Sequence, residues 1–291
     1  MAEIKGANLL RLAIPKGRMY ENVVGVLADA GISVSQTARS YRPHVTLEGC
    51  EVKILKPQNI VKMLHAASRD VGFAGADWVA ELDGDLVELV DTGLDPVRVV
   101  AAAPTAMLEE GALPDRALVV ASEYERLTRS WIGERGLDAT FVRSYGATEV
   151  FPPEDADLIV DNTATGSTLD ANDLQIVDEL MSSSTRLYAC PRALEDRQRR
   201  AIIEDLVLLV ESVLEARRRV MVEVNVTEEA LPALLDVLPC MRQPTISPLA
   251  GGEGFAVKAA VPRKVLAEVV PRIKAAGGSD IVVTRLAQIV A

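Results

Sequence analysis

The sequence predicts an α/β protein that carries a smaller, ferredoxin-like unit at its C-terminal end. Short apolar runs alternate with helical segments through the first half of the chain, and a strand-rich pattern begins after residue 219. The length of 291 residues is also long for one domain and suggests two or three.

The first half of the chain contains segments of two kinds. Short apolar runs indicate buried strands, whereas the spacing of Val23, Val24 and Leu27 is that of one helix face. This alternation is typical of parallel sheets covered by helices, which bind ligands at the carboxyl ends of their strands. The predicted strands are 9–14, 52–55, 70–74, 97–103, 117–121 and 157–160, and the predicted helices are 21–30, 60–67 and 123–134.

A long amphipathic helix over 194–219 separates this half from the C-terminal unit. The arginines at 217–219 complement the dipole at the end of that helix, and we interpret them as a solvated helix terminus. The pattern after this helix is roughly a βαββαβ unit, the ferredoxin-like arrangement. Its predicted strands are 220–226, 255–261 and 281–284, and its predicted helices are 228–238 and 264–276.

Composition excludes several classes of function. The net charge of −11 argues against broad binding of nucleic acid or anionic membranes. The absence of a long apolar run and of the stages of a signal peptide predicts a cytoplasmic protein with no membrane span. Three widely spaced cysteines without a CxxC argue against disulfides and zinc. His44 and His65, the only histidines, leave little material for a histidine metal cage or a Ser-His-Asp triad.

The most informative segment is 157–169, which reads D-L-I-V-D-N-T-A-T-G-S-T-L. Successive backbone amides in such a loop can form a concave anion site, and Gly166 permits close approach of the backbone. Asp161 would repel a phosphate and suits ribose hydroxyls or a magnesium ion on the substrate. A capped helix after a turn rich in Ser and Thr explains the composition equally well. The candidate residues are Asp161, Asn162, Thr163, Ala164, Thr165, Gly166, Ser167 and Thr168.

This loop resembles the phosphoribosyl pyrophosphate loop of the ATP phosphoribosyltransferase family, the first enzyme of histidine biosynthesis. Further segments carry the same resemblance, and their order and spacing span nearly the whole chain. They are P-K-G-R at 15–18, D-V-G-F-A-G-A-D at 70–77, G-A-T-E-V at 146–150, L-D-A-N at 169–172 and P-T-I-S-P-L-A at 244–250.

The resemblance implies the long form of the enzyme, in which two lobes similar to a periplasmic binding protein flank a cleft. It places catalytic domain I at 1–95 and 181–215, catalytic domain II at 96–180, and an ACT-like regulatory domain at 216–291. The implied reaction transfers the phosphoribosyl group to N1 of the adenine of ATP and releases pyrophosphate. The implied partners are ATP, phosphoribosyl pyrophosphate, Mg2+ held mainly by substrate, histidine as inhibitor, and further copies of the chain in a dimer and a hexamer.

The resemblance also implies roles for individual residues. No strong base is needed, because adenine N1 already carries a lone pair, so positioning and charge neutralisation should dominate. Residues 161–168 would bind phosphoribosyl pyrophosphate, and Lys16, Arg18 and Glu149 would position the substrates. The ATP-binding residues would be Lys16, Gly17, Arg18, Lys56, Gly75 and Asp77, and the allosteric residues would be Glu223, Thr245 and Ser247.

The chain differs from the family pattern at one place. The family has an arginine followed by D-I-P, whereas this chain has Lys56 followed by N-I-V at 59–61. One alternative is a prephenate dehydratase, but the Thr-Arg-Phe signature of that family is not found, and the nearest match is T-R-L at 185–187. Another alternative is a type I phosphoribosyltransferase. A non-catalytic small-molecule sensor with the same fold is the alternative from another class.

Overall fold

The computed structural model describes residues 9–35 and 41–290, and the chain forms two compact units. The first comprises the residues up to 25 together with 33–204, and the second comprises 26–32 and the residues from 205 onward. Residues 1–8, part of the segment in which we expect no signal peptide, lie outside the described residues. None of the helices within the described ranges has both the length and the hydropathy that crossing a bilayer requires.

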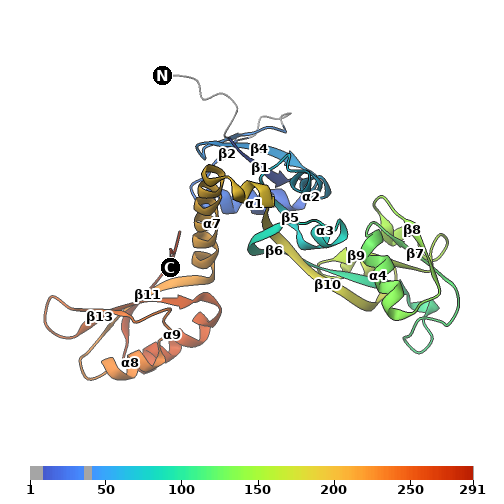
Figure 1. Ribbon diagram of the computed structural model, residues 1–291. Helices are drawn as coiled ribbons and strands as arrows, with labels where there is room; N and C mark the ends of the chain where they lie inside the picture. The colour runs from blue at the N-terminus through green and yellow to red at the C-terminus, as the bar shows by residue number, and fades with distance from the viewer. Residues whose placement is uncertain (1–8, 36–40, 291) are drawn as a thin grey trace, which may run out of the picture. The chain divides into compact units, whose positions relative to one another are not determined.

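The first unit is built on one eight-stranded sheet with the strand order β4-β1-β5-β10-β6-β9-β7-β8 (Figure 1). Strand β1 pairs in parallel with β4 and β5, and β7 pairs in parallel with β8 and β9. The two groups are joined by antiparallel strands, so the sheet is mixed and our expectation of parallel sheets is wrong at its centre. The strands are β1 (Leu10–Pro15), β4 (Cys50–Leu55), β5 (Val71–Gly75), β6 (Val87–Pro104), β7 (Leu118–Ser122), β8 (Ala139–Arg143), β9 (Leu158–Thr163) and β10 (Leu174–Ala189).

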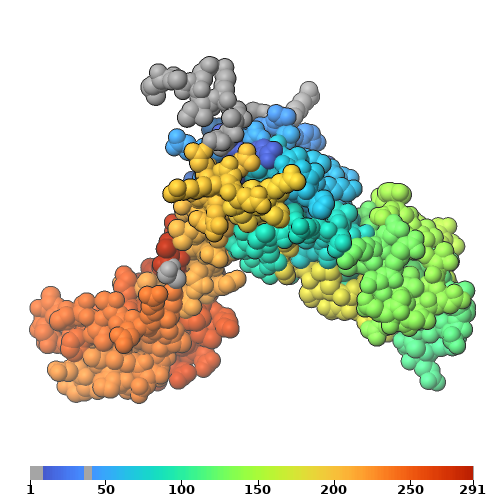
Figure 2. All heavy atoms as spheres, viewed as in Figure 1, coloured from blue at the N-terminus to red at the C-terminus, as the bar shows by residue number. Residues whose placement is uncertain are grey.

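Two long central strands connect the halves of this sheet. Strand β6 has 18 residues and β10 has 16, and they run antiparallel to each other. The end of β10 also pairs with β5 of one half, and β6 pairs with β9 of the other, so the pair β10-β6 joins the two halves. In Figure 2 the atoms of the segment that holds β7, α4 and β8 form one continuous green group. A short antiparallel pair is formed by β2 (Val34–Ser35) and β3 (His44–Val45).

Each half of the sheet has its own apolar core. Ile60 and Leu64 of the second helix pack with Ala13 and Ala74 in one half, and Trp131 packs with strand residues in the other. Burial of these side chains is the main favourable contribution to folding. The helices are α1 (Arg18–Asp29), α2 (Pro57–His65), α3 (Ala76–Glu81), α4 (Glu125–Arg135), α5 (Ser167–Ala171), α6 (Pro191–Glu195) and α7 (Arg197–Arg218), with 3-10 turns η1 (Thr105–Met107) and η2 (Thr148–Val150).

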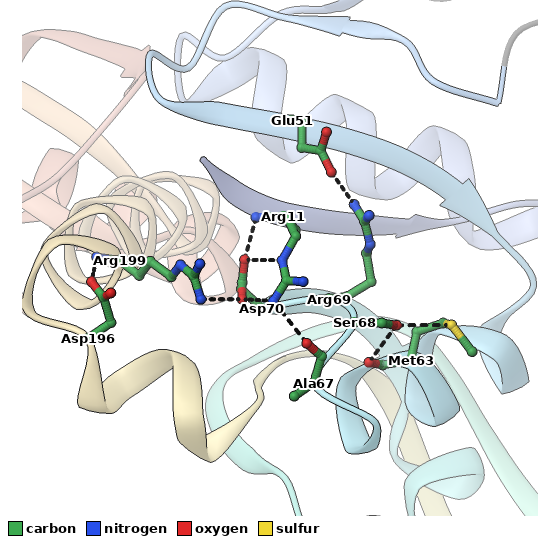
Figure 3. Close-up of polar contacts among 9 residues, drawn as sticks. All are labelled: Arg11, Glu51, Met63, Ala67, Ser68, Arg69, Asp70, Asp196 and Arg199. Atoms are coloured by element: carbon green, nitrogen blue, oxygen red, sulfur yellow. Dashed lines mark hydrogen bonds and ion pairs between the residues drawn. The ribbon is translucent and has the colours of Figure 1, made fainter. Parts of the chain in front are cut away.

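A buried ion cluster fixes the first turn of α7 to the amino ends of β1 and β5 (Figure 3). Asp70 is only 1% exposed and accepts hydrogen bonds from the Nε and Nη2 atoms of Arg11 at 2.9 and 2.6 Å. Arg199 of α7 approaches the same carboxylate at 3.4 Å. Burial alone would raise the pKa of Asp70, but the hydrogen bonds of Arg11 and the charges of both arginines outweigh burial and lower it.

The second unit has a four-stranded antiparallel sheet with the order β12-β13-β11-β14. Along β11 every second residue is buried, which confirms the alternation that the sequence predicts for 220–226. The buried residues pack with Leu234, Val269 and Ile273 of two helices. The elements are β11 (Arg219–Val226), α8 (Leu231–Val237), β12 (Thr245–Pro248), β13 (Phe255–Pro262), η3 (Arg263–Val265), α9 (Leu266–Ala275) and β14 (Ser279–Arg285).

Candidate functional site

The loop between β9 and α5 is a surface turn held by its own hydroxyl groups. Thr163 Oγ1 accepts a hydrogen bond from the Gly166 amide at 3.0 Å, and the hydroxyls of Thr165 and Ser167 lie 3.0 Å apart. Gly166 has a φ of +86°, in the left-handed region that favours glycine. The amides of Ala164 and Thr165 donate to no acceptor among residues 9–35 and 41–290. The shape of the turn is therefore fixed by internal hydrogen bonds, and the amides of Ala164 and Thr165 can donate to a ligand.

Helix α5 contributes less to this loop than the sequence suggests. It has only five residues, Ser167–Ala171, so its macrodipole is small. Any anion bound here would be held by individual amides and hydroxyls rather than by the field of a long helix.

Asp161, at the end of β9, is the electrostatically perturbed residue of the segment. Burial, together with the negative charges of Glu149 and Glu123, raises the pKa of its carboxyl to about 6. The Asn162 amide donates to Asp161 Oδ1 at 2.7 Å and works in the opposite direction. Negative charge from Glu149 and Glu123 thus acts on Asp161 near the end of β9, and a cation or a pair of sugar hydroxyls would offset it. Glu123 is not among the site residues that were predicted from the sequence.

A buried hydrogen-bond network connects this segment with Asp77. The hydroxyl of Tyr124 donates to Asp77 Oδ2 at 2.7 Å, and Asn162 Nδ2 donates to the same hydroxyl at 3.0 Å. The ring of Tyr124 stacks on Trp78 with centroids 4.7 Å apart. Burial, followed by the charge of Asp77, raises the pKa of Tyr124 well above its ordinary value, so the phenol stays protonated. Tyr124 therefore links two segments that the sequence analysis treats as separate.

Gly75 and Asp77 are placed by the same network. A Cβ atom at Gly75 would collide with Asp77 Oδ1, so a side chain there would displace this carboxylate. Ser183 of β10 donates to Asp77 Oδ1 at 2.7 Å and accepts from the Asp77 amide at 3.0 Å. Both carboxylate oxygens of Asp77 are therefore engaged by side chains of the protein, and Asp77 is only 5% exposed.

Basic side chains gather at the carboxyl ends of β1 and β4, which are neighbours in the sheet. Lys16 follows β1 and Lys56 follows β4, and the Lys16 amide donates to the carbonyl of Leu55 at 2.8 Å. The positive charge of Arg69, then burial and Arg42, lower the pKa of Lys53 in the same place. Such crowding of like charges favours a bound anion. The pocket has a volume of about 460 Å³, and its lining includes Lys16, Tyr41, Arg42, Lys53, Lys56 and Asn59.

The other residues of the first predicted segment lie beside this pocket. Gly17 has a φ of +81° at the turn into α1, and Arg18 is the exposed first residue of that helix. Neither belongs to the lining of the pocket, whereas Lys16 and Lys56 do.

Two protein-family models match the chain. The description "ATP phosphoribosyltransferase" matches residues 56–212, and "HisG, C-terminal domain" matches residues 216–288. The chain belongs to the ATP phosphoribosyltransferase family.

Individual relatives of the chain agree with that assignment. The ATP phosphoribosyltransferase of Chlorobium chlorochromatii is 33% identical over 278 residues, which are 94% of this chain and 95% of the relative. That of Pelotomaculum thermopropionicum is 33% identical over 286 residues, 97% of this chain and 99% of the relative. Among solved structures, the ATP phosphoribosyl transferase (HisG:HisZ) complex from Thermotoga maritima aligns with a TM-score of 0.62 at 26% identity, covering 70% of this chain and 99% of the other.

The chain is therefore an enzyme of the transferase class that catalyses the first step of histidine biosynthesis. This result favours the transferase over the prephenate dehydratase and the small-molecule sensor. The basic pocket and the loop after β9 both belong to the first unit.

In the second unit, the predicted allosteric residues lie on β11 and β12, the two strands that flank β13. Glu223 of β11 is opposite Lys258 of β13, which is opposite Thr245 of β12. Directly opposed residues share one face of a sheet, and Glu223 alternates with residues that are buried against the helices. Lys258 Nζ lies 2.6 Å from Glu223 Oε1. Ser247 is exposed two residues further along β12.

Proposed function

We propose that residues 161–168 bind the ribose 5-phosphate part of phosphoribosyl pyrophosphate. The observation that carries this proposal is the self-braced loop with unused amides, directly after a partly buried carboxylate. The amides of Ala164 and Thr165 and the hydroxyls of Thr165 and Ser167 face a phosphate, and Asp161 accepts hydrogen bonds from the ribose hydroxyls. Glu149 lies close enough to raise the pKa of Asp161 and serves the same sugar.

The phosphates of ATP occupy the basic pocket at the ends of β1 and β4. Lys16, Lys53 and Lys56 supply the charge, and the exposed ring of Tyr41 offers the adenine a flat apolar surface. Arg18, at the adjacent start of α1, provides a planar fork for a phosphate. The replacement of the family's arginine by Lys56 keeps a positive charge in this pocket. Asn59, where the family has an acidic residue, removes a negative charge from it.

The transfer is a displacement at C1 of the ribose. The lone pair of adenine N1 forms the new N–C bond while the bond from C1 to the pyrophosphate oxygen breaks and pyrophosphate leaves, with inversion at C1. Positive charge that develops on the ribose is stabilised by the carboxylates of Asp161 and Glu149. Lys16 and Arg18 neutralise phosphate charge and hold the two substrates in line, so positioning supplies most of the acceleration.

Magnesium would enter this site bound to the substrate. No three His, Cys, Asp or Glu side chains within the described ranges are grouped to hold a metal ion. Asp161 and Glu149 would hold Mg2+ through its water ligands, in keeping with the preference of this ion for oxygen and water. When bound, the ion neutralises the leaving pyrophosphate.

Gly75 and Asp77 serve the nucleotide site through the network around Tyr124. Asp77 receives the Tyr124 hydroxyl, and Tyr124 receives Asn162, so a shift at the ATP side of the site is transmitted to the phosphoribosyl side. Ser183 completes the network from β10.

The domain organisation follows the two halves of the sheet. We assign 1–95 with 181–215 to catalytic domain I, 96–180 to catalytic domain II, and 216–291 to an ACT-like regulatory domain. The last assignment is supported by the order β12-β13-β11-β14, which a ferredoxin-like βαββαβ unit has.

Histidine binds this regulatory domain and inhibits the enzyme. Glu223 suits the ammonium group of the amino acid, Lys258 suits its carboxylate, and Thr245 and Ser247 supply hydroxyls beside them. We further propose a cytoplasmic homo-oligomer, with a dimer and a hexamer as its forms.

One assay tests the reaction and its regulation. Protein, ATP, phosphoribosyl pyrophosphate and Mg2+ are mixed, and both pyrophosphate release and a new ultraviolet-absorbing adduct are followed, with and without histidine. We expect adduct and pyrophosphate to form in equal amounts. Histidine should slow the reaction of the unaltered chain, and it should not slow the reaction of the Glu223→Gln variant. No adduct at any magnesium concentration would refute the proposed reaction, and an unchanged rate with histidine would refute the regulatory proposal alone.

A further inference from the structure

A pocket in the second unit collects arginines from separate elements. It has a volume of about 380 Å³, and Arg217, Arg219, Arg263 and Arg285 belong to its lining. Asp29, from the end of α1, is the one acidic residue of that lining. The described lining thus holds four arginines and one aspartate, in a chain whose net charge is −11.

The fold brings these arginines together at one end of the sheet. Arg219 begins β11, and its partner in β13 is Pro262, immediately before Arg263. Arg285 ends β14 and is opposite Val220 of β11. Strands β11 and β14 and the turn η3 after β13 therefore place arginines at the same end of the sheet. Arg217, in the last turn of α7, adds a fourth from the helix that leads into β11.

Two of the four charges are balanced within the unit. Arg217 Nη2 lies 2.6 Å from Asp29 Oδ2, and Arg219 is paired with Glu215. Arg263 and Arg285 make no ion pair or hydrogen bond with any of the residues that the structure describes. Interaction with the helix dipole accounts for Arg217, but it does not account for Arg263, which begins η3, or for Arg285, which ends β14.

We propose that this arginine pocket binds a linked phosphate group, such as pyrophosphate or the phosphate chain of a nucleotide. A guanidinium offers two parallel N–H donors that match two oxygens of a phosphate, which a lysine cannot do. The fixed pairs of Arg217 and Arg219 hold the walls of the pocket, and Arg263 with Arg285 supplies the donors. The pocket is separate from the proposed catalytic residues, all of which belong to the first unit.

Arginine footprinting of the full chain locates the site. Phenylglyoxal modification is followed at each arginine by peptide mass, with pyrophosphate, ATP or AMP added in separate titrations. At five times the dissociation constant, pyrophosphate should slow modification of Arg263 and Arg285 about sixfold, because protection follows 1 + [L]/Kd. Arg200 and Arg272, which are paired with glutamates elsewhere, should be unaffected. Protection by ATP alone would identify a nucleotide as the source of the phosphate chain.

A charge-matched pair of variants separates this site from the catalytic one. Arg263→Ala with Arg285→Ala should remove one class of pyrophosphate sites in calorimetry and leave adduct formation in the absence of added pyrophosphate intact. Arg200→Ala with Arg272→Ala removes the same charge and should bind as the unaltered chain does. Equal footprints with and without every phosphate ligand, or unchanged pyrophosphate binding by the first variant, would overturn the proposal.

Discussion

Replacement of Asp161 by asparagine should stabilise the first unit while it removes activity. The carboxylate of Asp161 is partly buried beside Glu149 and Glu123, and these conditions raise its pKa from 3.8 to about 6. Above that pH the folded protein holds a carboxylate where a neutral group would be favoured. The amide of asparagine is neutral at every pH and keeps an oxygen that can accept the Asn162 amide hydrogen bond.

The magnitude is set by the two pKa values. A change from 3.8 to about 6 corresponds to about 3 kcal/mol, since one pKa unit is worth about 1.4 kcal/mol. Partial solvent access reduces this figure, so we expect a net gain of about 1–2 kcal/mol and a rise of about 3–6 °C in Tm. Because the folded pKa is raised, the protonated form contributes stability that is lost as the pH rises from 4 through 6. The advantage of the amide should therefore be absent at pH 4 and complete at pH 8.

Thermal unfolding at the two pH values measures this effect, and initial rates of adduct formation measure the cost in function. Loss of the charge should slow the reaction about 100-fold, as removal of one charge-stabilising group does elsewhere. Asp115→Asn, at an exposed position between β6 and β7, is the matched control and should change neither quantity. A Tm at pH 8 that is equal to or below that of the unaltered chain would refute the electrostatic reasoning about Asp161.

Three further variants test the surrounding structure. Tyr124→Phe removes the donor to Asp77 and should cost about 1–2 kcal/mol in urea unfolding, with a lower kcat; full stability would show that the network is unimportant. Lys56→Ala should raise KM for ATP about tenfold, the equivalent of one phosphate contact, and equal increases for both substrates would contradict the assignment of the basic pocket. Asp70→Asn should cost about 3 kcal/mol at pH 7, because Arg11 loses its buried partner. The pKa of Asp70 is lowered, so that difference should shrink in acid unfolding as the pH falls below about 4, and a constant difference would be inconsistent with it.

The sequence predicts the strands beside the site because they are short, continuous apolar runs. The segments 9–14, 52–55, 70–74 and 157–160 correspond to β1, β4, β5 and β9 within a few residues. The position of the loop after β9 is predicted by the same pattern. The helix after that loop, α5, has five residues and ends at Ala171.

Strand β10 has no comparable signal in the sequence. It reads LQIVDELMSSSTRLYA, in which charged residues and a run of serines interrupt any alternation. Its conformation is fixed by pairing with β6 and β5, and its polar side chains are satisfied there, as Ser183 is by Asp77. Such long-range pairing overrides local preference, which is why parallel sheets were expected where the sheet is mixed.

The missed site residues have a related cause. Ser183 lies in the unpredicted strand, and its role depends on a partner more than a hundred positions away. Glu123 and Tyr124 follow the predicted strand 117–121 almost directly. Ligands bind at the carboxyl ends of strands, and by that rule both residues are candidates for the site. Their contacts with Asp77 and Asp161 depend on the fold and cannot be read from the sequence.

The central claim is that the turn at 163–168 holds a sugar phosphate, and a pair of variants at Gly166 tests it most directly. Asn tolerates the left-handed φ of +86° better than other residues with side chains, and Asp has nearly the same shape with a negative charge. Calorimetry with phosphoribosyl pyrophosphate should show binding to Gly166→Asn and none to Gly166→Asp, with equal Tm for the two variants. Equal affinity of both variants for phosphoribosyl pyrophosphate would contradict the account.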